Sequence, residues 1–229
     1  YRNVYNPTSS FMQPRDSKGD FQPDYSPDNY TSHICESNGW HYMWSAQHDV
    51  KGLVKLVGKK RFTEKLDSMF TYSPKANAEL PLFSTGMIGQ YAQGNEPSHH
   101  VAYLFNKIGQ PEKTQKYIYE ILTGLYKDTP DGLCGNEDCG QTSAWYVLSA
   151  LGFYPLNPVS CQYELGTPLF KKATIHLENG KDFVIESQNH TNGKYEVESA
   201  YINGKKVKDY TIDHKAMMNG GTLTFKMKQ

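Results

Sequence analysis

Three short stretches of the 229-residue chain combine carboxylate, amide and aromatic side chains at spacings that could support chemistry. The first runs from Cys35 to Trp44 and places Glu36 a few residues before Trp40 and Trp44. Two tryptophans four residues apart share one face of a helix, where they could stack on a flat ligand beside the carboxylate. The same residues would also make an ordinary helix start with two core tryptophans, so both interpretations stay open.

The second stretch covers residues 93–100, where Asn95 and Glu96 come directly before Pro97. Grouped amide and carboxylate oxygens are the ligands that a hard cation such as calcium prefers. The same two side chains could simply cap a helix that begins at the proline, and the sequence does not separate the two roles. His99 and His100 are adjacent and would point to different faces of a helix, so they make a poor zinc pair.

The third stretch covers residues 131–146 and has Asn136, Glu137 and Asp138 in a row between two glycines. Glycines let the backbone turn tightly, so that short acidic side chains can project into one pocket. The spacing does not match an EF-hand loop. The alternative is a solvated acidic loop that caps a helix beginning near Thr142.

Composition narrows the classes of ligand. The chain has 24 basic and 24 acidic residues and no net charge, which argues against nucleic acid or an anionic membrane as a partner and favours a neutral substrate. No apolar stretch is long enough for a membrane span, and the start lacks a signal-peptide layout. Because the chain begins at Tyr1 without Met, within what reads as ordered sequence, we expect a piece cut from a longer protein. The four cysteines do not form a zinc pattern, and disulfides and free thiols both stay open: Cys35, Cys134, Cys139 and Cys161.

The elements that would position these stretches are mostly helical up to Pro155. Four prolines within residues 1–34 predict a long structured loop. Apolar periodicity predicts a helical hairpin over residues 48–57 and 61–70 with a break at 58–60, and a helix over 97–108 closed by Gly109. Further helices are predicted over 112–126 and 141–151, the last nearly all buried.

After Pro155 the period changes to two. The pattern predicts antiparallel strands over residues 173–177, 183–186, 195–202 and 222–227, with turns at Asn179–Gly180, Asn203–Gly204 and Gly220–Gly221. Helix pairs followed by strands favour a helical toroid or bundle with an attached β segment. Because these strands are too few for a sandwich, we expect them to complete a sheet whose other strands lie outside the chain.

Taken in order, the motifs resemble the signature blocks of glycoside hydrolase family 92. The resemblance rests on Gly94–His100 and Gly135–Tyr146, continues through Ser149–Pro155, and extends from Phe11–Arg15 to Gly220–Leu223. It implies a calcium-dependent, inverting exo-α-mannosidase with a mainly α fold. Residues 1–155 would be part of an (α/α)6 barrel, or helical toroid, and residues 156–229 the C-terminal antiparallel strands. The family's N-terminal β-sandwich domain would be absent from this chain.

The resemblance also implies roles for single residues. Glu36 matches the general acid and Asp138 the general base, while Asn136 stands where the family has an aspartate. An amide at that position can still orient a water molecule or bind a cation. Asn95 and Glu96 fall where the family binds calcium. An inverting glycosidase needs its two carboxyl groups about 6.5–9.5 Å apart, a gap that two separate loops can supply.

For the substrate we expect contacts from four further residues: Arg15, Trp40, Gln93 and Gly94. Family members selective for α-1,2 linkages carry a His-Glu pair at the position of Gln93–Gly94, which argues against that linkage here. The implied substrate is a mannose-containing oligosaccharide or glycoprotein glycan, and the implied location is extracytoplasmic, periplasmic or secreted, in a bacterium. The rival hypothesis is a catalytically incompetent fragment that serves as a carbohydrate-binding or packing module.

Overall fold

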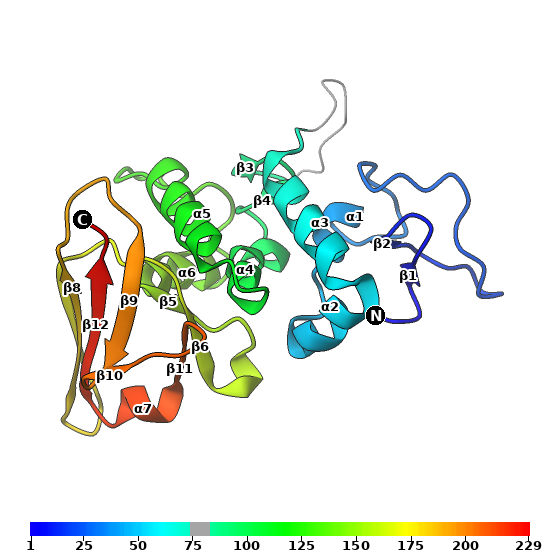
Figure 1. Ribbon diagram of the computed structural model, residues 1–229. Coiled ribbons are helices and arrows are strands. Elements are labelled where there is room, and N and C mark those ends of the chain that lie inside the picture. Colours follow the sequence, from blue (N-terminus) through cyan, green and yellow to red (C-terminus); the bar gives the residue numbers. More distant parts are fainter. Residues whose placement is uncertain (74–82) are drawn as a thin grey trace.

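The structure, a computed structural model, describes residues 1–73 and 83–229. Its parts follow the sequence: an extended N-terminal segment, a group of helices in the middle and a sheet region at the C-terminal end (Figure 1). Strands account for a larger share of the residues than the expected mainly α fold with a β segment would have. Within the described ranges, no helix is long and apolar enough to cross a membrane.

The N-terminal segment is a structured loop, as predicted. Its only strands in the described residues are two short ones that pair antiparallel: β1 (Tyr5–Asn6) and β2 (Phe11–Met12). Asp49, at the start of the first long helix, anchors this segment by accepting hydrogen bonds from Tyr1 Oη (2.7 Å) and Arg2 (2.8 Å). Polar and aromatic contacts therefore hold a proline-rich stretch in place without regular structure.

The predicted helical hairpin is confirmed as α2 (Val50–Val57) and α3 (Lys59–Thr71). Only Gly58 separates the two helices, because its φ of +88° reverses the chain at little cost for a residue without a side chain. The Asp49 side chain accepts from Gly52 N and caps α2. Each helix buries one apolar face, including Leu53 on α2 and Phe62 on α3.

The helix predicted over 97–108 is wrong as a continuous helix. Short turns take its place, namely 3₁₀ turns Glu96–Ser98 and Val101–Tyr103 and the single α-turn α4 (Leu104–Lys107). In a regular helix the His99 carbonyl would accept from Tyr103 N, but here it accepts from Trp145 Nε1 at 2.8 Å. Tyr103 N bonds to the His100 carbonyl instead, which tightens the turn. The predicted stop at Gly109 is confirmed by its φ of +81°.

The next two helices form where predicted, as α5 (Pro111–Gly124) and α6 (Gln141–Ala150). The expectation that the second is nearly all buried is wrong. Trp145 is fully buried, whereas Val147 on the other side of α6 is 54% exposed. The reason is one-sided packing, because α6 lies against α5 and the adjoining strand β5 (Phe153–Tyr154).

The larger sheet has five strands in the order β10-β9-β12-β8-β7. The bounds are β7 (Lys172–His176), β8 (Asp182–Gln188), β9 (Val197–Ile202), β10 (Lys205–Lys206) and β12 (Gly221–Met227). The turns at Asn179–Gly180 and Asn203–Gly204 are confirmed, but β12 runs parallel to β8, so the sheet is mixed and not antiparallel throughout. A crossover through β11 (Thr211–Asp213) and α7 (His214–Met218) intervenes between β10 and β12 and sets this direction.

A second sheet has the order β11-β6-β5, with β6 at Gln162–Leu165. Side chains from both sheets fill one hydrophobic core, in which Phe153, Phe183 and Phe225 are fully buried. The β region thus has a core of its own, and β5 adds to it from before the expected boundary at residue 156. That the strands also complete a sheet with partners outside this chain stays a prediction.

Two loops of the helical region cross with their backbones in contact. The hairpin of β3 (Met87–Ile88) and β4 (Tyr91–Ala92) leads into Gly94, and the loop after α5 passes over it at Gly135. A Cβ atom on Gly135 would lie 2.5 Å from Gly94 Cα and 2.6 Å from Gly94 O. A Cβ atom on Gly94 would lie 2.9 Å from Cys134 O. Glycine is therefore required on both sides of the crossing.

Replacing Gly135 with alanine should force the two loops apart. We expect Gly135→Ala to lower the free energy of unfolding of the whole protein by about 1–3 kcal/mol, the usual range for overpacking. Gly124→Ala is the matched control, because that helical glycine has nothing within 4 Å of its would-be Cβ. The control should be neutral or slightly more stable in chemical denaturation. Equal stability of the two variants would contradict the crossing.

The buried ring of His100 predicts a dependence of stability on pH. Its Nε2 donates to Trp44 O at 2.9 Å, and burial lowers its pKa to about 4. Because the unfolded chain takes up the proton first, stability is full above about pH 6.5 and is lost as the pH falls toward 4. His100→Gln keeps a donor for Trp44 and should flatten this slope, by up to roughly 3 kcal/mol at the acid end. If the free energy of unfolding fell equally with pH in the parent and in the variant, the assignment of this pH dependence to His100 would be contradicted.

Candidate active site

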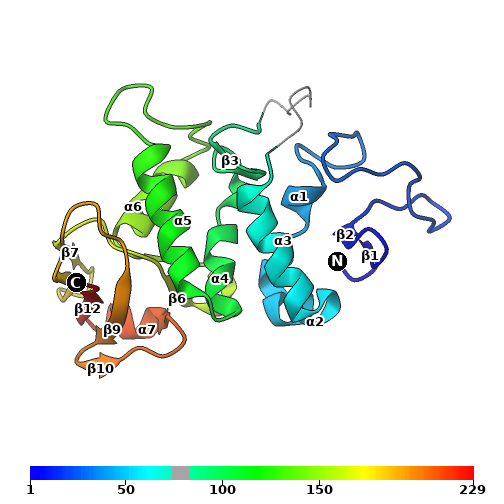
Figure 2. The ribbon, with the colours of Figure 1, turned by 45° about the horizontal axis from the view of Figure 1, so that its top comes forward.

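The structure brings the three polar stretches of the sequence together. Figure 2 shows α1 (Gly39–Tyr42), the β3–β4 hairpin and the loop after α5 along one edge of the molecule. The pKa of Glu96 is raised, first by burial and then by the neighbouring carboxylates of Asp138 and Glu36. Asn95 Nδ2 also donates to the backbone oxygen of Glu36 at 3.2 Å. Carboxylates from three separate loops therefore share one site.

Glu36 sits in the last turn before α1, with a φ of +52°. A left-handed backbone at a non-glycine residue costs free energy and occurs mostly where neighbours hold it in place. Asn38 is one such neighbour, because its Oδ1 caps α1 by accepting from Trp40 N (3.0 Å) and His41 N (3.3 Å). Asn95 holds the other side through the Glu36 carbonyl. The Glu36 side chain is exposed in this chain.

In the loop before α6, neighbouring acidic residues have different surroundings: one caps the helix and the next lies near Glu96. Glu137 caps the helix, because its carboxylate accepts from Gly140 N and Ser143 N, and hydrogen bonding, chiefly with Ser143, lowers its pKa. Asp138 has a φ of +49°, and its carboxylate lies near enough to Glu96 to raise the pKa of that residue. Asn136 is exposed, and its backbone oxygen accepts from Thr142 Oγ1 at 2.8 Å. The capping interpretation therefore applies to Glu137, and a catalytic role for Asp138 stays a prediction.

Asn95 and Glu96 have the chemistry of hard-cation ligands. Glu96 Oε1 is buried without a hydrogen-bond partner, and Asn95 is 6% exposed and uses its amide nitrogen on Glu36. An unpaired buried oxygen beside two further carboxylates suits a cation. In residues 1–73 and 83–229 no group of three or more His, Cys, Asp and Glu side chains has the arrangement of a metal site. A cation at this point would take its other ligands from water, backbone oxygens or substrate.

The two histidines of the second stretch serve as structural links. His99 Nε2 donates to Gln93 O (3.0 Å), and its Nδ1 lies 3.2 Å from Gln141 Nε2, which also donates to Tyr154 (3.0 Å). Burial lowers the pKa of His99 to about 4, so the ring is neutral near pH 7 and can accept from the amide. This network joins the Glu96 loop to the start of α6, and sequence reasoning missed it because His99 and Gln141 are 42 positions apart.

The side chains predicted to bind substrate have other partners. Gln93 is fully buried and bonds to Tyr91 and Tyr126, and Gly94 lies in the loop crossing. Arg15 is exposed, with its guanidinium 3.6 Å from the centre of the Phe21 ring. In the described part of the chain none of these residues is hydrogen-bonded to the three carboxylates. Their contact with substrate stays a prediction.

The two tryptophans do not form an exposed pair. Helix α1 ends at Tyr42, so Trp44 lies beyond it, fully buried against Phe62. Trp40 is 8% exposed, stacks on Tyr72 with ring centres 5.4 Å apart, and donates from Nε1 to Asp28 at 2.8 Å. The core interpretation therefore holds for both tryptophans.

The four cysteines are free thiols: Cys35, Cys134, Cys139 and Cys161. Two of them directly neighbour predicted catalytic carboxylates, and Cys134 packs beside the loop crossing, where burial raises its pKa.

Comparisons with known proteins point to glycoside hydrolases. The catalytic domain of glycosyl hydrolase family 92 matches residues 1–229. A family GH92 alpha-mannosidase of Bacteroides thetaiotaomicron, BT3965, covers the whole chain with 37% identity and a TM-score of 0.93, and a second structure of it holds mannoimidazole. A GH92 inverting mannosidase of the same bacterium, BT2199, gives 37% identity and a TM-score of 0.87. An uncharacterized secreted glycosidase of the fungus Arthroderma benhamiae is 30% identical over 82% of the chain.

The chain spans only part of these relatives. It covers 30% and 32% of the two bacterial structures and 23% of the fungal protein. The match to the family's catalytic domain nevertheless runs over every residue, including all three loops that meet at Glu96. The chain therefore belongs to glycosyl hydrolase family 92.

Proposed function

We propose that this chain is the C-terminal part of an inverting, calcium-dependent exo-α-mannosidase. The observation that carries the proposal is the meeting of Glu36, Glu96 and Asp138 from three loops at one edge of the molecule. Its sequence identity of 37% with two solved bacterial mannosidases supports the choice of sugar. We also propose that residues 1–155 form part of an (α/α)6 barrel and that an N-terminal β-sandwich domain completes the enzyme.

In the proposed mechanism Glu36 is the general acid. Its carboxyl proton passes to the oxygen of the leaving group as the bond between that oxygen and the anomeric carbon breaks. Asp138, the general base, takes a proton from a water molecule that attacks the anomeric carbon from the opposite face. Asn136 helps to orient this water. The product is mannose with inverted anomeric configuration, and each carboxyl group is restored by proton exchange with solvent.

Asn95 and Glu96 would hold the calcium ion through their side-chain oxygens. When bound, calcium would orient the sugar hydroxyls and stabilise a distorted ring. The buried, unpaired Oε1 of Glu96 supports this assignment, as does the pKa of Glu96, which burial and nearby negative charge raise. A cation would relieve both the missing partner and the crowding of negative charge.

We propose that the substrate is a mannosyl oligosaccharide or glycoprotein glycan with a linkage other than α-1,2, because Gln93–Gly94 replaces the pair expected for that linkage. An extracytoplasmic location is supported by the fungal relative, which is described as secreted. The exposure of Glu36 and Asp138 indicates that other parts of the protein close the pocket, so residues 1–229 alone would be incompetent.

Substitution of the two catalytic carboxylates should separate their roles. In the whole protein with calcium, Glu36→Gln should lower kcat at least about a hundredfold on unactivated α-mannosides and much less on an aryl mannoside whose leaving group needs no proton. Asp138→Asn should lower kcat on both substrates, because both need an activated water. NMR should detect β-mannose as the first product of the parent enzyme. Release of no mannose from any α-mannoside would disprove the proposed function.

Glu137→Gln is the matched control for these variants. It changes a carboxylate one residue from Asp138, but its amide oxygen can still accept from the α6 backbone. We expect kcat within a few-fold of the parent and a stability loss of about 1 kcal/mol or less. A loss as large as that of Asp138→Asn would mean that the two roles are assigned to the wrong neighbours.

Replacement of Glu96 should trade calcium affinity for stability. Glu96→Gln removes one charge from a group of three carboxylates, so we expect weaker calcium binding by about tenfold or more in calorimetry. Without calcium the variant should be as stable as the parent or up to about 1 kcal/mol more stable, since partial exposure keeps the repulsion small. Unchanged calcium affinity would remove Glu96 from the metal site.

A further inference from the structure

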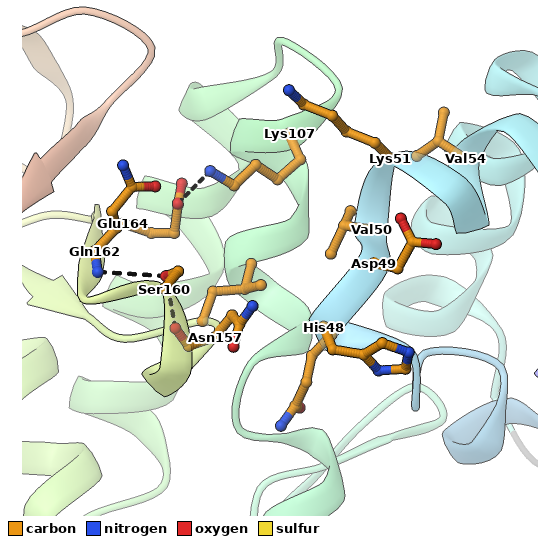
Figure 3. Close-up of a pocket in the computed structure, with 12 residues that line it drawn as sticks. His48, Asp49, Val50, Lys51, Val54, Lys107, Asn157, Ser160, Gln162 and Glu164 are labelled. Carbon is orange, nitrogen blue, oxygen red and sulfur yellow. Dashed lines mark hydrogen bonds and ion pairs between the residues drawn. The ribbon is translucent and has the colours of Figure 1, made fainter.

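A cavity lies on the opposite side of the molecule from the three carboxylates Glu36, Glu96 and Asp138. Its volume is about 380 Å³, and it opens between α2 with the turn before it on one side and β6 with the turn before it on the other (Figure 3). Both ribbon views place α2 and β6 at the lower edge and the β3–β4 hairpin at the upper edge (Figures 1 and 2). None of its lining residues belongs to the catalytic stretches.

A buried ion pair forms one wall of this cavity. The Glu164 side chain is 4% exposed and pairs with Lys107, which points toward it from α4 (Figure 3). Burial raises the pKa of Glu164, and Lys107 opposes that rise. Asn106 Nδ2 donates to the same carboxylate at 3.4 Å and Thr211 Oγ1 at 3.3 Å. The wall therefore presents hydrogen-bonded charged groups whose net charge is zero.

The remaining lining suits a neutral molecule with many hydroxyl groups. Asn157, Ser160 and Gln162 line one side with amide and hydroxyl groups, and Val50 and Val54 give an apolar patch on α2. The polar groups are held in place, because Ser160 Oγ donates to Asn157 O and Gln162 Nε2 donates to Asp213. A sugar ring needs both surfaces, hydrogen-bond partners for its hydroxyls and an apolar face for its C–H groups. A phosphate ligand is disfavoured, because Glu164 neutralises Lys107 and Asp49 lies in the opposite wall.

The cavity continues into a second depression of about 570 Å³. The two share Lys51, Lys107 and Gln162, so they form one groove that runs past the ion pair. The second part has mixed charge, because Lys59, Lys208, Asp209 and Asp213 all line it. A groove of this extent fits a chain of sugars better than a single ring.

We propose that this groove is a second glycan-binding site, which holds a remote stretch of a long mannosyl glycan while a chain end enters the catalytic site. The choice of mannose rests on the proposed function; the neutral polyhydroxyl chemistry rests on the groove itself. An enzyme that removes single end residues gains from such a site, because the polymer stays bound between cleavage events.

The test uses the whole protein with Glu36→Gln to prevent turnover and with mannoimidazole at saturation to fill the catalytic site. Into this background Asn157→Ser and Gln162→Ala are introduced together. Serine keeps an oxygen that can accept from Val159 N, as Asn157 does now, so the local turn is preserved. Asn192→Ala, an exposed amide in the loop before β9, is the control.

We expect the Kd for a soluble polymeric α-mannan to rise at least about fivefold in the double variant, as for the loss of one or more neutral hydrogen bonds, and to stay unchanged in the control. In the active enzyme the same pair should raise KM for the mannan and leave kcat/KM for an aryl mannoside unaltered. An unchanged Kd overturns the groove proposal. Absence of hydrolysis of any α-mannoside by the parent would instead disprove the proposed function, and the binding measurement would still decide whether the groove holds glycan.

Discussion

The backbone contact between Gly94 and Gly135 is the constraint on which the candidate site depends. Two loops about forty residues apart in the sequence touch through their backbones just before Glu96 and Asp138, and so bring these carboxylates near each other. A side chain at the crossing would meet backbone atoms of the other loop and push the loops apart. The hydrogen bond between His99 and Gln141 is a second link between the same two loops. Position at this site is therefore determined by backbone contact and buried polar links, not by the carboxylates themselves.

The three carboxylates have backbone angles or surroundings that are unfavourable in themselves. Glu36 and Asp138 both have left-handed backbones, and Glu96 keeps a buried oxygen unpaired beside two like charges. Strain and repulsion of this kind lower stability, so they persist only where the surrounding structure over-determines the geometry. Here the surroundings are a capped α1, a capped α6 and the loop crossing. These unfavourable features are gathered at one edge, while the buried apolar side chains of the helical and the β region form two separate cores.

Local sequence patterns predicted those helices and turns whose structure depends on residues close together in the chain. Helices α2, α3, α5 and α6 follow apolar periodicity, and the two Asn-Gly turns follow turn chemistry. The stretch 97–108 also has helical periodicity, but Trp145 takes the carbonyl that a helix would need, and no local pattern reveals a partner 46 positions away. The parallel pairing of β12 with β8 likewise depends on a crossover and not on the alternation within either strand.

The same limit applies to the site. The residue types of Glu36, Glu96 and Asp138 marked them as candidates, and the family resemblance gave them roles, but periodicity alone left each with a capping or core alternative. The structure shows that such alternatives need not exclude one another. Glu137 caps α6 so that Asp138 is free to face Glu96, and Asn38 caps α1 so that Glu36 is presented at the loop end. Which member of a polar cluster caps and which faces the site is decided by backbone angles that the sequence pattern does not contain.

The irregular stretch from Gln93 to Gly109 connects the two edges of the molecule. At one end it carries Asn95 and Glu96, and at the other Asn106 and Lys107 bind Glu164 of β6. Between them residues 101–105 are fully buried. A regular helix over the same residues would rise 1.5 Å per residue with fixed side-chain directions, whereas 3₁₀ turns rise about 2.0 Å and alter them. The loss of helical regularity thus allows one buried segment to reach both the carboxylate site and the ion pair that joins the helical region to the β region.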